Sequence, residues 1–317
     1  MRTTIVGPYP RIGSNAGDIL RQRINDSYLR KSSIGEVQRL QRNLTHEVLG
    51  ELVGAGIDIP NTGLVDVHDE LTWPLEYANG IEFGGMKKIF HTNTHYREAK
   101  VVGEISPRTK PTELYEEARK NFPQIKLELP GPYTLAQHSV LTENSPYKNL
   151  NDLIHAYVDL LRSWISRVSA PLIQFNEPSL IQGEFPHQLR NVYERLVDGI
   201  QFPIAVWTFY GKYSSELLSE LFSLPVDIIG LDCVWDTELD QHLRRQKPDK
   251  GIGFGIVDSG DRGYIVLEDP QQIVERLKRL EGYVDFNRSL VSSNATLEHL
   301  PREVARKKLQ IISEVRL

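Results

Sequence analysis

Acidic and amide side chains follow several apolar runs that predict β-strands. These polar groups are Asp66-Val67-His68-Asp69-Glu70, Asn176-Glu177-Pro178, Asp232-Cys233, Asp258 and Asn294. One such group is typical of any polar loop. Parallel strands, however, end on one face of a sheet or barrel, so these side chains are expected to converge there. The rim they would form indicates a site for a polar small molecule with amino, carboxylate or hydroxyl groups.

The carboxylates of this rim allow two kinds of chemistry. Glu177 with Asp232 or Asp258 would supply the two acids of a glycoside hydrolase, and these three are the catalytic candidates. A hard or borderline metal ion would need neighbouring ligands, for which the candidates are His68, Asp69, Glu70 and Asp232. The chain has no His-Glu-x-x-His or Cys-x-x-Cys pattern and no Gly-x-Ser-x-Gly nucleophile elbow.

Two further segments carry candidate binding residues. The rigid turn 129–134 (LPGPYT) would place Tyr133 and Thr134 over the mouth of the site, or it is a simple structural corner. Residues 87–96 gather two lysines, two histidines, Asn93 and Tyr96 around an aromatic ring. This composition fits a loop that contacts a ligand, and equally a surface loop without one.

Short β-rich runs alternate with helical segments, a pattern that predicts parallel strands joined by crossover helices. The eight predicted strands are 57–61, 101–105, 126–129, 172–175, 204–209, 227–231, 253–257 and 290–293. The eight predicted helices are 34–54, 112–121, 150–169, 187–198, 214–223, 237–246, 270–280 and 301–315. Eight such units predict one (β/α)8 TIM barrel.

In this prediction residues 56–317 form the barrel, and residues 1–55 form an N-terminal extension of an arm and helices. The β-like run 3–7 is assigned to the arm. An open doubly wound sheet is disfavoured because no Gly-rich phosphate loop follows an early strand.

Composition excludes several classes of protein. The chain has 317 residues, a formal charge of −5 and no basic block, which argues against nucleic acid as a partner. Cys233 is the single cysteine, so neither a disulfide framework nor a paired-thiolate metal site is expected. No apolar run is long enough to span a membrane, and the start lacks a signal-peptide core. The sequence thus predicts a cytoplasmic protein.

Several strings, read in order, resemble cobalamin-independent methionine synthase. They are TTIVGPYPRIG (3–13), AGIDIP (55–60), KIFHTNTHY (88–96), LPGPYT (129–134), IQFNEP (173–178), LPVD (224–227) with LD (231–232), and VSSNATLEHLP (291–301). Together they span nearly the whole chain, and the strings 88–96 and 292–301 favour the family's zinc-free N-terminal half.

The resemblance implies a family enzyme of two face-to-face barrels, in which the C-terminal barrel carries zinc and homocysteine and methyl-folate binds between the two. The positions that match its zinc ligands hold Trp207, Phe209, Asp232 and Ala295 here. Zinc is therefore not expected in this chain.

The resemblance also assigns the methyl-donor contacts. The family's motif Asp, which holds the homocysteine amine, is Asn176 here, and the lysine-containing run that grips a folate tail is replaced by 16–19 (AGDI). A methyl-folate or a related pterin is the expected donor. The residues proposed to bind it are Arg11, Lys88, Asn93, His95, Tyr96, Tyr133, Thr134 and Asn176.

One-barrel length and missing zinc ligands suggest the zinc-free subunit of a split methionine synthase. It would bind the methyl donor for a zinc-bearing core barrel on a separate chain. The alternatives are a ligand-binding barrel without turnover, a carboxylate-dependent hydrolase, and a methyltransferase with an unrecognised metal site.

Overall fold

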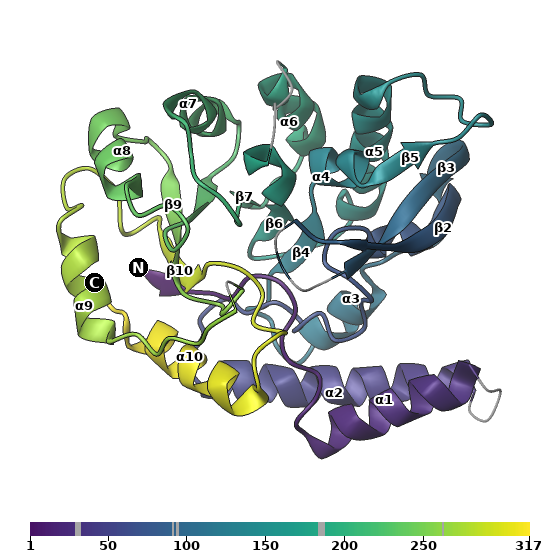
Figure 1. Cartoon of the computed structure of the whole chain (residues 1–317), viewed down its shortest axis with the longest axis horizontal. Coiled ribbons are helices and arrows are strands. Elements are labelled where there is room, and N and C mark those ends of the chain that lie inside the picture. The colour runs from purple at the N-terminus through teal and green to yellow at the C-terminus, as the bar shows by residue number, and fades with distance from the viewer. Residues whose placement is uncertain (29–32, 91, 93–94, 183–187, 262) are drawn as a thin grey trace.

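A curled sheet of parallel strands lies at the centre of the protein (Figure 1). The computed structural model describes residues 1–28, 33–90, 92, 95–182, 188–261 and 263–317. The strand order is β1 (Arg2–Thr3), β10 (Leu290–Ser293), β9 (Gly251–Val257), β8 (Ile228–Asp232), β7 (Ile204–Trp207), β6 (Ile173–Asn176) and β4 (Leu127–Pro130). Every residue from β4 to β10 in this sheet is buried. Burial on both faces is typical of a parallel sheet covered by helices.

Both edges of this sheet contact one segment, residues 57–61. Thr4 and Ile59 form a parallel bridge, and the backbone N–H of Ile59 donates to the carbonyl of Thr3 at 3.0 Å. On the other side, the N–H of Lys126 donates to the carbonyl of Pro60 at 2.8 Å. The segment therefore lies between β1 and β4, the two edge strands.

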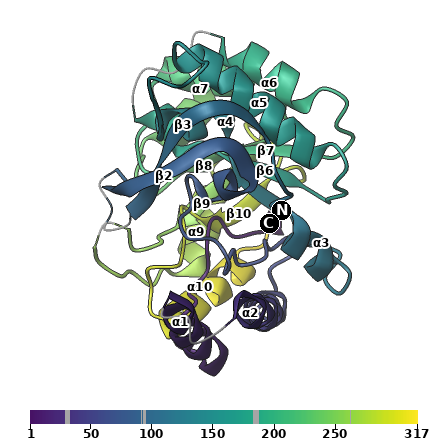
Figure 2. The same cartoon turned by 90° about the vertical axis from the view of Figure 1, so that its right-hand side faces the viewer.

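Helices surround the sheet, as Figures 1 and 2 show. They are α3 (Glu113–Arg119), α4 (Pro132–Gln137), α5 (Leu150–Ile165), α6 (Leu189–Val197), α7 (Ser215–Ser223), α8 (Leu239–Gln246), α9 (Pro270–Lys278) and α10 (Arg302–Glu314). In both views α1 (Asn15–Tyr28) and α2 (Ile34–Gly54) lie side by side at one end of the molecule. Within the described ranges, no helix is both long and apolar enough to cross a bilayer.

Helix α5 illustrates how the sequence specifies these elements. The side chain of Asn149 caps the helix by accepting from the N–H of Asp152 at 2.9 Å. Leu153, Tyr157 and Leu161 recur at helical spacing and are all buried. Burying each such side chain contributes roughly 1.5–3 kcal/mol, which fixes the face that packs on the sheet.

Three predictions about strands are wrong. Residues 57–61 were expected to form a strand, but only Ile59 forms a β-bridge, to Thr4, and the segment is not a regular strand. Residues 101–105 were expected in the central sheet, but they belong to β3 (His95–Pro107), which pairs antiparallel with β2 (Ala78–Lys88) and parallel with β5 (Ser139–Leu141) in a separate sheet. The run 3–7 was expected in an arm, but its start lies in β1, paired with β10. Periodicity predicts a strand but not its partner, because pairing depends on residues far away in the chain.

The predicted helices are confirmed, with shorter ends, as α2, α3 and α5 to α10. Helix α1 and the short α4 were not predicted. Helix α4 begins inside the predicted turn 129–134, where Pro132 occupies the first helical turn and so loses no hydrogen bond there. Two 3-10 helices, Trp73–Tyr77 and Pro178–Ile181, complete the described elements.

Candidate functional site

A cavity of about 370 Å³ lies at the face of the sheet where the strands end. Its walls come from loops that are distant in sequence: the segment after β1, the loop after residues 57–61, the β2–β3 hairpin and the loop after β10. The lining residues are Arg11, His68, Asp69, Glu70, Met86, Ile89, His95, Glu298 and His299. We call this cavity the mouth. Its size and its mixture of charged and apolar walls suit a small polar ligand.

Glu70 is the most perturbed acid of the mouth. Only 6% of the residue is exposed, and burial raises its pKa to about 8, with Glu298 and Asp69 nearby adding to the effect. Its Oε1 accepts from the hydroxyl of Tyr210 at 3.1 Å, whereas its Oε2 is buried and has no hydrogen-bond partner within the part of the chain that the structure describes. Glu70 is thus largely protonated at neutral pH, and an unsatisfied oxygen is available to a ligand.

Asp69 is held as an anion instead. Burial would raise its pKa, but hydrogen bonds from His68 and the backbone outweigh burial and lower it. The N–H groups of Leu71 and Thr72 donate to Oδ1 at 2.7 and 2.6 Å. His68 lies 2.9 Å from Oδ2 of Asp69, and its ring packs edge-on against Phe83 of β2. Asp69 therefore orients the imidazole at the mouth.

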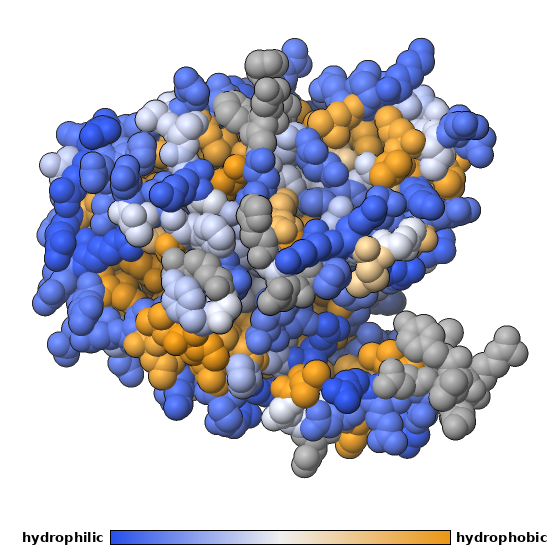
Figure 3. Space-filling view, in the orientation of Figure 1, coloured by the Kyte–Doolittle hydropathy of each residue, from blue (hydrophilic) through white to orange (hydrophobic). Residues whose placement is uncertain are grey.

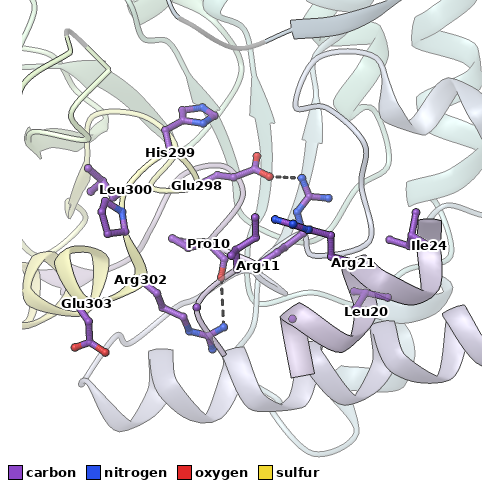
Figure 4. Close-up of a pocket in the computed structure, with 14 residues that line it drawn as sticks. Pro10, Arg11, Leu20, Arg21, Ile24, Glu298, His299, Leu300, Arg302 and Glu303 are labelled. Atoms are coloured by element: carbon purple, nitrogen blue, oxygen red, sulfur yellow. Dashed lines mark hydrogen bonds and ion pairs between the residues drawn. The ribbon is translucent and has the colours of Figure 1, made fainter. Parts of the chain in front are cut away.

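Arg11 crosses from the segment after β1 to the loop after β10. Its guanidinium donates to the carbonyl of Val67 at 2.9 Å and pairs with the carboxylate of Glu298 (Figure 4). Next to this pair, burial lowers the pKa of the His299 imidazole. Arg11 thus holds two loops of the mouth together, and its charge is already partly neutralised.

The hairpin residues predicted to bind a ligand are placed differently from one another. His95 lines the mouth. Lys88 pairs with His95 in the β2–β3 register and has an exposed side chain outside the lining. The ring of Tyr96 packs edge-on against His138 at 4.4 Å between centroids, and burial lowers the pKa of His138 to about 4. Asn93 lies outside the described residues.

Glu177 follows β6 and is completely buried, and its carboxylate lies at the N-terminus of α4. Its carboxylate accepts from the backbone N–H groups of Tyr133 at 3.0 Å and Thr134 at 2.7 Å, and from the hydroxyl of Tyr193 at 3.0 Å. Burial raises its pKa to about 7. A Cβ at Gly131 would lie 2.3 Å from this carboxylate, so glycine makes room for it. The turn therefore contributes backbone donors to Glu177, and neither Tyr133 nor Thr134 lines the mouth.

Asn176 belongs to a polar network inside the sheet's curl. Its amide donates to Glu128 at 2.7 Å and its oxygen accepts from Gln174 at 2.8 Å. The ammonium of Lys126, completely buried, donates to Gln174 and lies 3.2 Å from Glu128. These buried polar groups satisfy one another, as stability requires, so Asn176 faces this network.

The carboxylates of Asp232 and Asp258 both accept hydrogen bonds from nearby backbone N–H groups. Asp232 accepts from the N–H groups of Tyr210, Val234 and Trp235 at 2.9–3.0 Å and from Asn294 at 3.2 Å. Burial raises its pKa to about 7. Asp258 accepts from the N–H of Gly260 at 2.8 Å. Neither carboxylate lines the mouth.

The four positions that match zinc ligands do not fit a zinc site. Trp207, Phe209 and Ala295 are fully buried in one apolar cluster and offer no ligand that zinc prefers. The indole of Trp207 fills the space over two glycines, since a Cβ at Gly230 or Gly253 would come within 2.0 or 2.5 Å of its ring. Over the described part of the chain, no group of three His, Cys, Asp or Glu side chains is arranged to hold a metal ion.

Sequence reasoning missed three residues that shape the site: Tyr210, Glu298 and His299. Glu298 and His299 follow the last strand, so the rule that polar residues at strand ends line the site would have included them. Tyr210 gives no local signal. Its contact with Glu70 joins residues 140 positions apart, and only the tertiary structure reveals it.

Known proteins resemble this chain along nearly its whole length. A family model described as "Cobalamin-independent synthase, N-terminal domain" matches residues 79–285. A methionine synthase from Sulfurisphaera tokodaii is 27% identical over 315 residues, which cover 97% of this chain and 89% of that protein. A methionine synthase from Saccharolobus solfataricus is 24% identical, with 97% and 91% covered.

Solved structures show the same fold. The B12-independent methionine synthase from Shewanella sp. W3-18-1, in complex with selenomethionine, superposes with a TM-score of 0.76 at 21% identity. The match covers 99% of this chain and 96% of that one. A putative vitamin-B12 independent methionine synthase from Listeria monocytogenes gives a TM-score of 0.70 at 17% identity.

Proposed function

This chain belongs to the cobalamin-independent methionine synthase family, because it matches the model of that family's N-terminal domain. On that premise we propose that it acts in methionine biosynthesis as a zinc-free barrel. In this role it binds the methyl donor at the mouth and presents it to a zinc-bearing barrel on a separate chain. That second barrel carries homocysteine and accepts the methyl group.

The observation that carries this proposal is the apolar packing of Trp207, Phe209 and Ala295. A free thiol has a pKa near about 8.5 and is mostly protonated at pH 7, and family members use zinc to present homocysteine as a thiolate. The side chains at the matching positions here cannot do this. Transfer to homocysteine therefore needs a thiolate prepared elsewhere.

We further infer that the curled sheet closes into a complete (β/α)8 barrel. The support is the segment 57–61, which hydrogen-bonds to β1 on one side and to the start of β4 on the other. Counted with the seven strands of the sheet, it makes an eighth member. Closure would place the mouth at the C-terminal end of the barrel, where sites in this fold are built.

Three groups of the mouth suit a methyl donor of the pterin type. Protonated Glu70 can donate to a ring nitrogen or carbonyl oxygen, because its Oε2 has no hydrogen-bond partner among the described residues. His95 lies on the opposite wall, from the hairpin, and Arg11 attracts an anionic group. These residues bind and orient the donor. None of them needs to act as a nucleophile.

Reconstitution tests the proposal. Methionine formation from 5-methyltetrahydrofolate and homocysteine is measured with this chain alone, with a zinc-bearing core barrel from the same host alone, and with both. We expect no turnover from this chain alone and at least about tenfold stimulation of the core barrel. Glu70→Ala, which removes the donor, should reduce the stimulation, and Arg190→Ala, at an exposed position on α6, serves as the matched control.

Each other outcome has a definite meaning. A core barrel that is equally active without this chain, with every donor tried, refutes the role of zinc-free partner. Turnover by this chain alone would instead support an independent methyltransferase, a reading favoured by the name of its relatives, of which this chain covers about nine-tenths. Donor binding without any effect on rate would leave a non-catalytic binding barrel.

A further inference from the structure

Tyr210, which follows β7, contacts the mouth from inside the protein. Hydrophilic side chains cover most of the face drawn in Figure 3. Glu70 and Tyr210 are instead polar side chains of the interior, 6% and 2% exposed. The phenol of Tyr210 donates to Oε1 of Glu70 at 3.1 Å, and over the described ranges this is the phenol's single hydrogen bond. Because Glu70 lines the mouth, the two side chains form one buried pair at its wall.

The backbone of Tyr210 is held in an unfavourable conformation. Its φ is 73°, in the left-handed region that an aromatic residue rarely adopts. Its N–H donates to Oδ2 of Asp232 at 2.9 Å, its carbonyl accepts from Nε2 of Gln182 at 2.7 Å, and its ring packs edge-on against Phe209 at 4.8 Å between centroids. Such strain persists where several contacts impose it, and it is common at functional sites. Here these contacts fix the direction of the phenol towards Glu70.

The hydrogen bond from Tyr210 decides which oxygen of neutral Glu70 carries the proton. A neutral carboxyl has one oxygen that accepts and one that donates. If the phenol donates to Oε1, the proton lies on Oε2, the oxygen without a partner in the described part of the chain. If Oε1 carried the proton and donated to the phenol oxygen, both the phenol O–H and Oε2 would be buried and unpaired. The first arrangement leaves one unsatisfied group instead of two, so it is favoured.

We propose that Tyr210 is a positioning residue for the mouth. It confines the carboxyl proton of Glu70 to Oε2, so that the mouth selects a ligand with a hydrogen-bond acceptor at this point. The inference rests on the proposed function in taking the methyl donor as that ligand, whose ring nitrogens and carbonyl oxygen are acceptors. Tyr210 is not among the residues that line the mouth, so it acts through Glu70.

The surroundings of Glu70 favour its neutral form. Burial has the largest effect and raises its pKa, and three nearby carboxylates add to the rise. These carboxylates are Asp69 in the same loop, Glu128 on β4 and Glu298 after β10. The mouth is also lined by the charged or titratable groups Arg11, His68, His95 and His299. The hydrogen bond from Tyr210 acts in the opposite direction, because it stabilises the carboxylate, so its loss should raise the pKa of Glu70 further.

Binding of 5-methyltetrahydrofolate to the full chain alone, followed by calorimetry at pH 7 and pH 9, tests the proton on Oε2. The pKa of Glu70 is about 8, so the neutral form and with it the affinity of the parent should fall about tenfold between these pH values. Glu70→Gln should bind within about threefold of the parent at pH 7 and change less than about twofold at pH 9, because Tyr210 holds the amide oxygen and the amide NH2 replaces the proton. Glu70→Ala, which has no donor, should bind at least about tenfold more weakly than the parent at pH 7.

Tyr210→Phe tests the positioning role. It keeps the ring contacts and the N–H bond to Asp232, and it should weaken binding about three- to tenfold at pH 7, as loss of one neutral hydrogen bond does. Because its Glu70 has a higher pKa, affinity should fall about fourfold or less between pH 7 and pH 9. A change that only damaged packing would keep the tenfold dependence of the parent. The matched control is Tyr193→Phe, which removes a buried phenol that donates to Glu177 at 3.0 Å outside the mouth and should stay within about twofold of the parent.

Two further variants complete the test. Tyr210→Phe combined with Glu70→Gln should bind about three- to tenfold more weakly than Glu70→Gln alone at both pH values, because the amide is then free to turn. The side chain of Gln182 is exposed, so Gln182→Ala loosens one anchor of Tyr210 without altering the buried pair. It should weaken binding about threefold, and it replaces Tyr210→Phe in the test if that variant does not fold.

Four results would overturn the inference. They are parent-like affinity in Tyr210→Phe (or in Gln182→Ala where it is the replacement), Glu70→Gln that binds as weakly as Glu70→Ala, an equal pH dependence of the parent and Glu70→Gln, and no saturable binding by the parent. The expected binding pattern without stimulation of a core barrel would refute the proposed function and leave the role of Tyr210 standing. Parent-like binding and stimulation by Tyr210→Phe, with both reduced in Glu70→Ala, would do the reverse.

Discussion

Glu70→Gln should change how the stability of the protein depends on pH. Glutamine keeps the shape of the side chain and an oxygen for the hydroxyl of Tyr210, but it cannot ionise. Burial raises the pKa of Glu70 from the ordinary 4.5 to about 8. Because the folded state holds this proton more tightly than the unfolded state, stability is greatest below pH 4.5 and falls as pH rises towards 8.

The size of the effect follows from the two pKa values. One pKa unit corresponds to about 1.4 kcal/mol, so the full loss between pH 4.5 and 8 is at most about 4–5 kcal/mol. Local relaxation of the protein and entry of water would reduce this loss to about half of that bound. Urea unfolding of both proteins at a series of pH values from 5 to 8.5 measures the difference directly. The variant should gain stability relative to the parent as pH rises.

Glu275→Gln, an exposed position on α9, is the matched control and should show no such trend. A difference between Glu70→Gln and the parent that stays constant from pH 5 to 8.5 would refute the reasoning. It would mean that the carboxyl of Glu70 titrates alike in the folded and unfolded states. The protonated donor assigned to the mouth would then be lost as well.

Three further predictions concern the frame of the site. Glu177→Ala should destabilise the fold by about 2–4 kcal/mol in urea unfolding, because it leaves two backbone N–H groups and the hydroxyl of Tyr193 without acceptors; a loss below about 1 kcal/mol would contradict this. Gly230→Ala should destabilise the fold by several kcal/mol, because the new Cβ would lie 2.0 Å from the ring of Trp207. In the control Gly35→Ala, in α2, the new Cβ meets no atom within 4 Å, so this change should be neutral or should stabilise the fold by about 1 kcal/mol. Equal melting temperatures for the two variants would argue against a filled interior. Arg11→Gln should lower the stimulation of a core barrel about tenfold. The free energy of unfolding should change by less than about 1 kcal/mol, because the ion pair of Arg11 with Glu298 is partly exposed. Unchanged stimulation would show that Arg11 does not contact the donor.

Local pattern explains why most helices could be predicted. Helix α5 has an Asn cap and apolar residues at helical spacing, and both signals lie within 17 residues of sequence. Helix α1 was missed because its apolar residues are few, and one of them, Ile19, remains exposed. Its position beside α2 stabilises it, and that is a tertiary contact.

The residues predicted to bind the donor differ in their positions relative to the mouth. His95 and Arg11 line it, whereas Lys88 lies outside the lining and Tyr96 packs on His138. Position in a loop indicates that a residue is near the site. It does not indicate whether the side chain points inward, because that depends on packing against other loops.

By itself, the sequence determined the family, the alternation of strands and helices and the loss of zinc ligands, because each of these is a matter of residue type and order. Only the tertiary structure decided which strands share the sheet, since the N–H groups of residues 57–61 and of β4 find their partners across long loops. It alone decided the surroundings of the carboxyls too. Glu70 and Glu177 are the same residue type, but Glu70 lines an open cavity and, among the described residues, has one oxygen without a partner, whereas Glu177 accepts from two backbone N–H groups.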